Sequence, residues 1–148
     1  MSELTLRVAT ANDVEPLLVL ITEFKELDGY RDRDDHHERE GLLPLIADPN
    51  LGYVVVAERD GELVSYAVLT WGWGLESGGR EALLDEFYVR PRGEGIGSRM
   101  FETCVLLARE AGAKVLFLET EAVNDRARTF YKRHGMQVEE SIWMISKL

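Results

Sequence analysis

Three glycines within seven residues form the most constraining feature of the chain. The stretch Arg92-Gly93-Glu94-Gly95-Ile96-Gly97-Ser98 follows an apolar run ending at Val89 and precedes apolar residues at helical spacing. This order predicts a strand, a glycine-rich turn and a helix. N–H groups at a helix start lack intrahelical partners and carry the positive end of the helix dipole. Because glycine allows close approach, the turn is a candidate pyrophosphate site, with a purely steric role as the alternative.

Two common nucleotide sites fit the sequence poorly. A Walker loop needs Gly-Lys-Ser/Thr after its glycines, whereas this chain has Gly97-Ser98-Arg99. A dinucleotide-binding turn usually lies in the first strand-helix unit, whereas this turn follows four predicted strands.

Hydrophobic periodicity predicts ten elements in the order β-α-α-β-β-β-α-β-α-β. Asp60-Gly61 between two β-rich runs predicts a hairpin, and four glycines from Gly72 to Gly79 predict a loop. We expect an α/β fold: a mixed, mostly antiparallel twisted sheet flanked by about four helices, in one domain over residues 1–148. The expected strands are 4–8, 53–58, 63–70, 82–89, 115–119 and 137–146, and the expected helices are 14–24, 38–47, 96–111 and 124–134.

The charge is strongly acidic and unevenly spread. The 148 residues carry a net charge of −10, which argues against a non-specific nucleic-acid binder. Residues 90–133 hold nine basic and six acidic residues, whereas the rest of the chain holds eight and 21. We therefore expect an anionic ligand near the first segment and a cationic one near the rest, with solubility as the plainer explanation. No apolar run approaches the ~20 residues of a membrane span and the start resembles no signal peptide, so we expect a cytoplasmic protein.

The residues around the glycine turn resemble the acyl-CoA-binding signature of the GCN5-related N-acetyltransferases, the GNAT family. Its Arg/Gln-x-x-Gly-x-Gly/Ala pattern is matched by Arg92, Gly95 and Gly97. The family's Asn-x-x-Ala-x-x-x-Tyr…Gly-Phe helix is similar to a second stretch, which contains Asn124, Ala127, Phe130, Tyr131 and Gly135-Met136. The expected element order also resembles the family's fold over nearly the whole chain. One departure is a loop shorter by two residues, because Pro91 runs directly into Arg92-Gly93.

The resemblance implies acetyl-CoA as the acyl donor and assigns residues to it. The backbone of Phe87, Tyr88 and Val89 would pair with the pantetheine arm and polarise the thioester carbonyl. The turn, with Arg92, Gly93, Glu94, Gly95, Ile96, Gly97 and Ser98, would hold the pyrophosphate. Asn124 and Phe130 would contact the cofactor from the last helix, although Asn124 is also a natural N-cap. Tyr131 would protonate the departing thiolate, and its alternative is a core tyrosine.

Asp85 and Glu86 are the candidate bases for the amine. Strict alternation along a strand would place Glu86 on the face of Leu84 and Asp85 on that of Phe87. Spermidine/spermine acetyltransferases carry a similar run, Leu-Glu-Asp-Phe-Phe-Val, and by that alignment Asp85 takes the position of the proposed base. The residues alone leave the choice between the two carboxylates open.

Other conspicuous residues favour structural roles. His36-His37 among acidic neighbours provides no third ligand at fixed spacing, so we expect no metal site. The acidic stretch 26–40 resembles in position the family's variable acceptor-lining segment. Trp71 and Trp73 could contact a substrate cation but more often such aromatics are core or dimer contacts. Cys104 lies on the apolar face of its helix and reads as a buried thiol.

These features together predict an N-acetyltransferase that transfers acetyl from acetyl-CoA directly to a primary amine, without an acyl-enzyme. A small cationic amine is the preferred acceptor. The alternatives are a protein N-terminus or lysine, an aminoglycoside, and an inactive CoA-binding regulatory domain. Dimers are frequent in the family, so a homodimer stays open.

Overall fold

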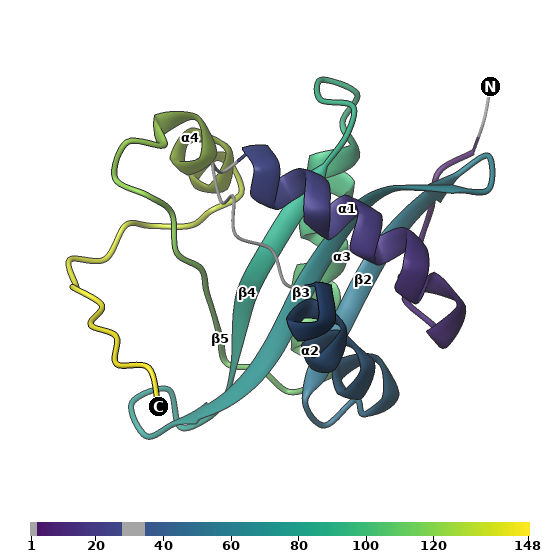
Figure 1. Cartoon of the computed structure of the whole chain (residues 1–148). Helices are drawn as coiled ribbons and strands as arrows, with labels where there is room; N and C mark the ends of the chain where they lie inside the picture. The colour runs from purple at the N-terminus through teal and green to yellow at the C-terminus, as the bar shows by residue number, and fades with distance from the viewer. Residues whose placement is uncertain (1–2, 28–34) are drawn as a thin grey trace.

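A five-stranded sheet divides the molecule into two faces in the computed structural model, which describes residues 3–27 and 35–148 (Figure 1). The strands lie in chain order across the sheet, and the first four are antiparallel while the last pair is parallel. The mixed α/β fold expected from the sequence is confirmed. The strands are β1 (Thr5–Val8), β2 (Gly52–Arg59), β3 (Glu62–Gly74), β4 (Gly79–Val89) and β5 (Val115–Phe117).

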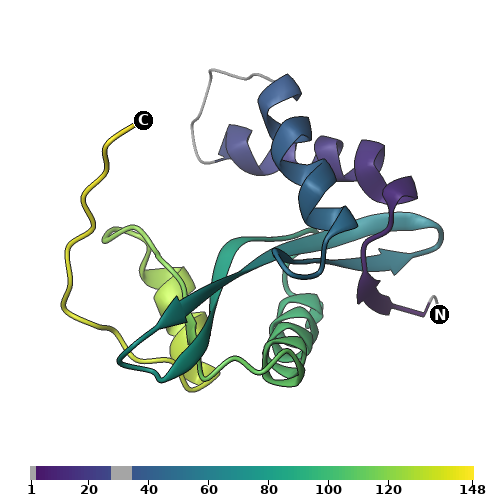
Figure 2. The ribbon, with the colours of Figure 1, turned by 90° about the horizontal axis from the view of Figure 1, so that it is seen from below.

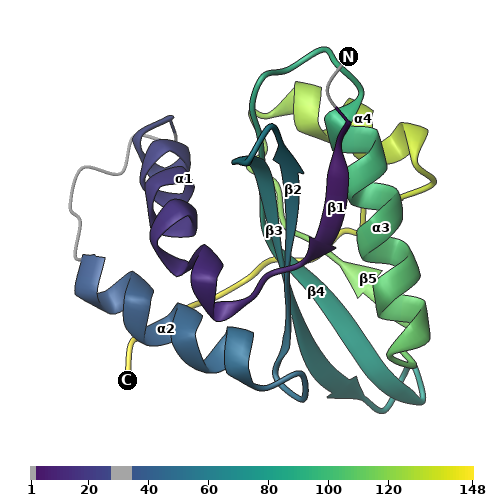
Figure 3. The same cartoon turned by 90° about the vertical axis from the view of Figure 1, so that its right-hand side faces the viewer.

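Helices cover both faces of this sheet (Figure 3). A short 3-10 turn (Ala11–Asp13) leads into α1 (Val14–Leu27), which packs with α2 (Asp35–Ala47) on one face. The other face carries α3 (Ile96–Glu110) and α4 (Asp125–Arg133). Each long helix buries one stripe: Leu17, Leu20 and Ile21 on α1, and Ile96, Met100 and Cys104 on α3. The predicted helices are therefore present, and α2 begins three residues earlier than expected, with Pro44 inside it.

A partly buried ion pair links the first strand to the turn that follows it. The Arg7 guanidinium lies 2.7 Å from the Asp13 carboxylate and 2.9 Å from that of Glu58 on β2. Its hydrogen bonds lower the pKa of the buried Asp13 carboxyl. The Asp13 carboxylate also accepts from the Thr10 N–H at 2.7 Å, as the third residue of a capping box does.

The loop predicted from Gly72 to Gly79 is largely strand. β3 and β4 stay paired through Trp71↔Ala82, Gly72↔Glu81 and Gly74↔Gly79, so only residues 75–78 form the turn. Glycine has a low propensity for strands, but the hydrogen-bonded pairing of β3 with β4 continues before and after Gly72 and outweighs that preference. The long hairpin carries Trp73 outward, where it is 75 % exposed.

The strand predicted for residues 137–146 is wrong in this structure. The chain after α4 has no regular secondary structure, and Figure 2 shows this tail, in yellow, curving away from the strands. A strand requires a backbone partner, but the tail and β5 meet only across an open pocket that both line. The apolar residues that suggested a strand, among them Ile142, Trp143 and Met144, are therefore exposed.

The parallel pairing of β4 and β5 ends early and leaves half of β4 open at its outer edge. The register runs from Glu81↔Val115 to Leu83↔Phe117. Beyond Leu83 the outer edge of β4 has no strand partner among the described residues. The remaining half of β4 leads directly into the glycine turn and α3.

Candidate active site

The glycine turn joins the open end of β4 to α3 through residues 90–95. Gly93 and Gly95 have φ values of 83° and 77°, a left-handed conformation that favours glycine. Gly95 is the N-cap of α3, and no side chain of the described residues caps the helix start. The N–H groups of the first turn of a 15-residue helix therefore point into this turn. Such an arrangement can hold an anion.

Gly97 lies where α4 packs against the start of α3, and a side chain there would make ordinary van der Waals contacts. A Cβ at Gly97 would lie 3.5 Å from the Phe130 ring and 3.8 Å from Val89. At the next residue, Ser98 Oγ lies 3.1 Å from His134 Nε2, and the His134 ring packs against Phe130 and Phe101. The two family motifs, far apart in sequence, thus meet at one place.

Charged side chains surround the turn. Arg92 and Arg99 are exposed, and Arg99 makes one long hydrogen bond of 3.5 Å to the Leu4 carbonyl. Glu94 is paired with Arg59 of β2 at 2.8 Å. Ile96 is a core residue at 2 % exposure, so only its backbone can face a ligand.

A β-bulge at Asp85 changes the faces of the two candidate bases. Val68 pairs with Glu86 and Leu69 pairs with Leu84, which leaves Asp85 as the extra residue. Leu84 and Phe87 consequently both pack on the α3 face, and Glu86 receives a hydrogen bond from Tyr66, a core residue of the α1 face. The expectation that Glu86 shares the face of Leu84 is therefore wrong. A bulge is not visible in the alternation of side chains.

The α1 face of β4 carries a linked set of polar groups. The Tyr66 hydroxyl donates to Glu86 at 2.8 Å. The Tyr88 hydroxyl and the Arg90 guanidinium both donate to Glu23 of α1, at 3.1 and 2.7 Å. Burial raises the pKa of the Tyr88 hydroxyl, and its hydrogen bond to the Glu23 carboxylate raises that pKa further. Tyr66 and Glu23 were not predicted as site residues, because nothing in a single sequence shows that β3 and α1 present them to β4.

Tyr131 lies on the opposite face, in the cluster around α3. Its ring packs edge-on against Phe87 at 6.3 Å and against Phe101 at 5.7 Å. Burial, with a smaller contribution from Cys104, raises the pKa of Tyr131 to about 12. The phenol therefore keeps its proton at neutral pH and can act as a donor. Asn124 is the N-cap of α4, where its side chain accepts from the Ala127 N–H at 3.1 Å.

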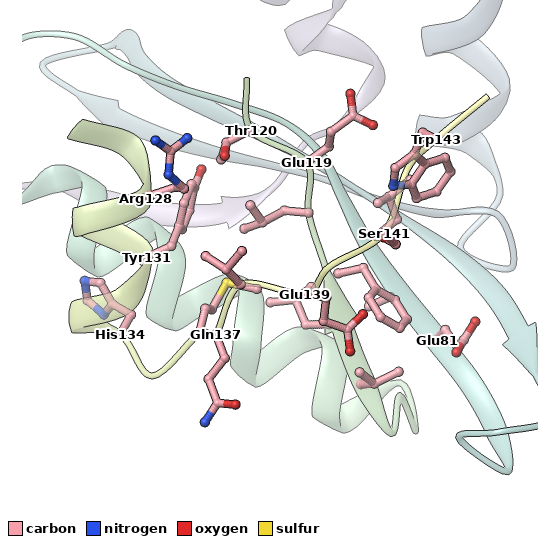
Figure 4. A pocket seen from close by; sticks show the side chains of 18 of the residues that line it. Glu81, Glu119, Thr120, Arg128, Tyr131, His134, Gln137, Glu139, Ser141 and Trp143 are labelled. Carbon is pink, nitrogen blue, oxygen red and sulfur yellow. The ribbon is translucent and has the colours of Figure 1, made fainter. Parts of the chain in front are cut away.

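A pocket of about 1250 Å³ lies beside β5, between α4 and the C-terminal tail (Figure 4). Its lining includes Arg128 and Tyr131 of α4, the C-cap residue His134, and, from the segments after β5 and α4, Glu119, Glu139 and Trp143. Asp85, Glu86 and the glycine turn lie outside its lining. The structure therefore separates Glu86, on the α1 face of β4, from Tyr131, on the α4 face.

The remaining sequence candidates have structural partners. Trp71 donates its ring N–H to the Pro49 carbonyl at 2.9 Å and packs edge-on against Tyr53. Cys104 is fully buried. Within residues 3–27 and 35–148, no cluster of metal-ligating side chains and no helix suited to cross a membrane is present. Residues 28–34 of the predicted acceptor-lining stretch 26–40 lie outside the described residues, as do the side chains of Asp35 and His36.

Comparisons with known proteins agree with this geometry. The family model of the acetyltransferase (GNAT) family matches residues 16–136. An aminoalkylphosphonate N-acetyltransferase of Salmonella typhimurium is 32% identical over 132 residues, which cover 88% of this chain and 82% of the relative. A crystal structure of an integron cassette protein from the mobile metagenome of Cole Harbour Salt Marsh superposes with a TM-score of 0.85 at 28% identity, covering 97% of this chain and 90% of that one.

A more distant structure shares the fold. The aminoglycoside N-acetyltransferase AAC(6')-Iy, solved in complex with CoA, has a TM-score of 0.84 at 15% identity, over 99% of this chain and 96% of that one. The two motifs meet at one helix start, the sheet matches, and the family model covers most of the sequence. The chain therefore belongs to the GNAT family of N-acetyltransferases.

Proposed function

We propose that the chain uses acetyl-CoA to acetylate the primary amine of a small cationic molecule directly. One observation carries the proposal. The unpaired edge of β4 ends at the glycine turn, with Glu86 on one face of the strand and Tyr131 against the other. A donor lying along that edge and an acceptor approaching from the α1 face would meet between them.

The chain's residues suit the phosphates and the arm of acetyl-CoA. The uncapped N–H groups of residues 96–98 can donate hydrogen bonds to the pyrophosphate, and Arg92 lies nearby. The left-handed glycines leave room for the phosphates to approach these groups. The backbone of Phe87 to Val89 lies beyond the last β4–β5 pair and can hydrogen-bond an extended chain. Asn124 and Phe130 would contact the cofactor from α4. Bound there, acetyl-CoA supplies a thioester carbonyl that an uncharged amine can attack.

The carboxylates of β4 provide a proton acceptor. An alkyl ammonium group has a pKa near ~10.4, so the amine must lose a proton before it can act as a nucleophile at pH 7. Asp85 or Glu86 can take that proton directly or through water. Tyr131, protonated at neutral pH, can donate to the leaving sulfur from the opposite face.

The charge distribution supports a cationic acceptor. Glu23, Asp85 and Glu86 belong to the part of the chain outside residues 90–133, where acidic residues exceed basic ones, whereas the glycine turn and α4 lie in the basic segment. A polyamine or diamine fits this separation. A second candidate acceptor is an aminoalkylphosphonate, the class named for the 32% identical relative. In this proposal residues 1–148 act as one domain, and a homodimer is an additional possibility that sedimentation would test.

A two-stage experiment tests the proposal. Calorimetric titration with acetyl-CoA should show saturable one-to-one binding. Binding is measured first because the loop at Pro91-Arg92, which leads into the proposed pyrophosphate site, is two residues shorter than in the family. A panel of spermidine, kanamycin, 1-aminoethylphosphonate and a peptide with a free N-terminus and a lysine then follows, with detection of the CoA thiol. We expect spermidine to react fastest. Binding without turnover of any amine would favour a regulatory CoA-binding domain, and a folded protein that fails to bind acetyl-CoA would refute the proposal.

A further inference from the structure

Tyr66 is the largest of the fully buried side chains, yet it carries a polar group. It belongs to the core cluster under α1 and α2, where an unsatisfied hydroxyl would be costly. The hydroxyl is satisfied by the Glu86 carboxylate, whose Oε1 lies 2.8 Å away. A buried donor thus reaches from the core to a carboxylate at the open half of β4.

The ring of Tyr66 is held by packing. Phe24 of α1 meets it edge-on at 6.4 Å with an interplanar angle of 88°, and the Tyr88 ring lies 6.2 Å away in the neighbouring strand. Tyr66 and Tyr88 are also cross-strand partners in the β3–β4 register. Because the ring is fixed by these contacts and by the strand, its hydroxyl is a preorganised donor. Glu86 is therefore held in one orientation.

Asp85 has a different environment, although it is the adjacent residue. It is the extra residue of the bulge and is exposed to solvent, and no described residue hydrogen-bonds or ion-pairs with its carboxylate. Glu86 is half-buried beside aromatic rings. A general base works best when its geometry is fixed relative to the proton that it removes. On that criterion the two carboxylates are not equivalent.

We propose that Tyr66 is a positioning residue that orients Glu86, and that Glu86 rather than Asp85 accepts the proton of the acceptor amine. This inference rests on the proposed function. The ammonium group loses two protons during the reaction: one passes to Glu86 and then to water, and the other ends on the sulfur of the CoA thiol. The nitrogen lone pair forms the N–C bond, and the electrons of the C–S bond leave with the sulfur.

Four variants test the assignment: Glu86→Gln, Asp85→Asn, Tyr66→Phe and the double variant Tyr66→Phe/Glu86→Gln. Kinetics at saturating acetyl-CoA use the fastest of spermidine, kanamycin and 1-aminoethylphosphonate. Glu86→Gln should lower kcat/KM for the amine by about 100-fold or more, the usual contribution of a general base, and Asp85→Asn by about tenfold at most. Tyr66→Phe should lower it about tenfold, and the double variant should be no worse than Glu86→Gln alone, because Tyr66 acts through Glu86.

The pH profile separates positioning from a structural effect. Hydrogen bonds to a carboxylate favour its charged form, so Tyr66→Phe should move the acidic limb of kcat/KM to higher pH. Among the described residues, Tyr66 of β3 donates to Glu86, and the other charged and titratable groups on this face are Glu23 of α1 with its two donors, Tyr88 and Arg90 of β4. Tyr53→Phe is the control, because Tyr53 packs against Trp71 in the other cluster, and it should leave the profile unchanged.

Three results would overturn the inference: Asp85→Asn as damaging as Glu86→Gln, additive effects of Tyr66→Phe and Glu86→Gln, or an unmoved acidic limb in Tyr66→Phe. Acetyl-CoA affinity, measured by calorimetry, should stay within about twofold in all variants, since none touches the glycine turn. A wild-type protein that binds acetyl-CoA but acetylates no amine would refute both the proposed function and this inference. An active wild type with active Glu86→Gln would refute the inference alone.

Discussion

Arg59 neutralises Glu94 in the middle of the glycine turn, with its Nη1 atom 2.8 Å from the carboxylate oxygen Oε2. The two residues come from different elements, since Arg59 ends β2 and Glu94 precedes α3. An acidic residue at a site proposed for a pyrophosphate would repel its ligand if left unpaired. We therefore expect the pair to affect cofactor affinity more than stability, because exposed ion pairs contribute little to folding.

Arg59→Gln should weaken acetyl-CoA binding by about three- to tenfold at low salt, because it leaves the Glu94 charge facing the phosphates. Glu94→Gln should strengthen binding or leave it unchanged, and the double variant should return close to the wild type. Calorimetric titration at low and high ionic strength measures this, and the differences should shrink as salt screens the charges. Equal affinities in the wild type and Arg59→Gln would mean that Glu94 does not face the cofactor.

Gly95→Asp should abolish acetyl-CoA binding. The substitution places a side chain and a negative charge at the N-cap of α3, where the pyrophosphate is proposed to lie. Gly112→Asp is a matched control at the other end of the same helix, because Gly112 also has a positive φ, of 89°, and open space around its Cβ position. Both variants should lose a similar amount of stability, about 1–2 kcal/mol for the strained backbone. Thermal unfolding checks that comparison, and normal binding in a folded Gly95→Asp protein would rule out the turn as the site.

Tyr131→Phe should lower kcat by about 10- to 100-fold and leave acetyl-CoA affinity within about twofold, because only the proton donor is removed. The ring contacts with Phe87 and Phe101 remain in this variant, so its fold should persist. Stopped assays of CoA thiol release give kcat, and calorimetry gives the affinity. Unchanged turnover would show that Tyr131 is only a core residue.

Most of the fold, but less of the candidate site, can be predicted from the sequence. The glycine turn and α4 could be predicted because their signals are local: a positive φ at Gly95, and the N-cap Asn124 and the positive φ of Gly135 at the two ends of the helix. The orientation of Glu86 could not, because the bulge at Asp85 depends on how β3 and β4 pair. The strand predicted for residues 137–146 was wrong for a related reason, because a strand needs an available partner edge as well as suitable residues.

Cys104 and Tyr131 make the stability of the fold sensitive to alkaline pH. Burial raises the pKa of both side chains to about 12, above the ordinary values of 9.0 for the thiol and 10.0 for the phenol. As the pH rises through that interval, the unfolded chain loses these protons first, so the folded state binds more protons. The free energy of unfolding should therefore fall between pH 9 and pH 12, as linkage requires with about 1.36 kcal/mol per unit for each fully titrating group. Urea denaturation at pH 8, 9.5 and 11 measures this dependence, and Cys104→Ala should flatten it in part.

At pH 8 the native Cys104 thiol should also react with iodoacetamide about a thousandfold more slowly than in the unfolded chain, since its thiolate fraction is reduced by that factor. Rapid alkylation of the folded protein would show that the face of α3 bearing Cys104 is not packed against the sheet.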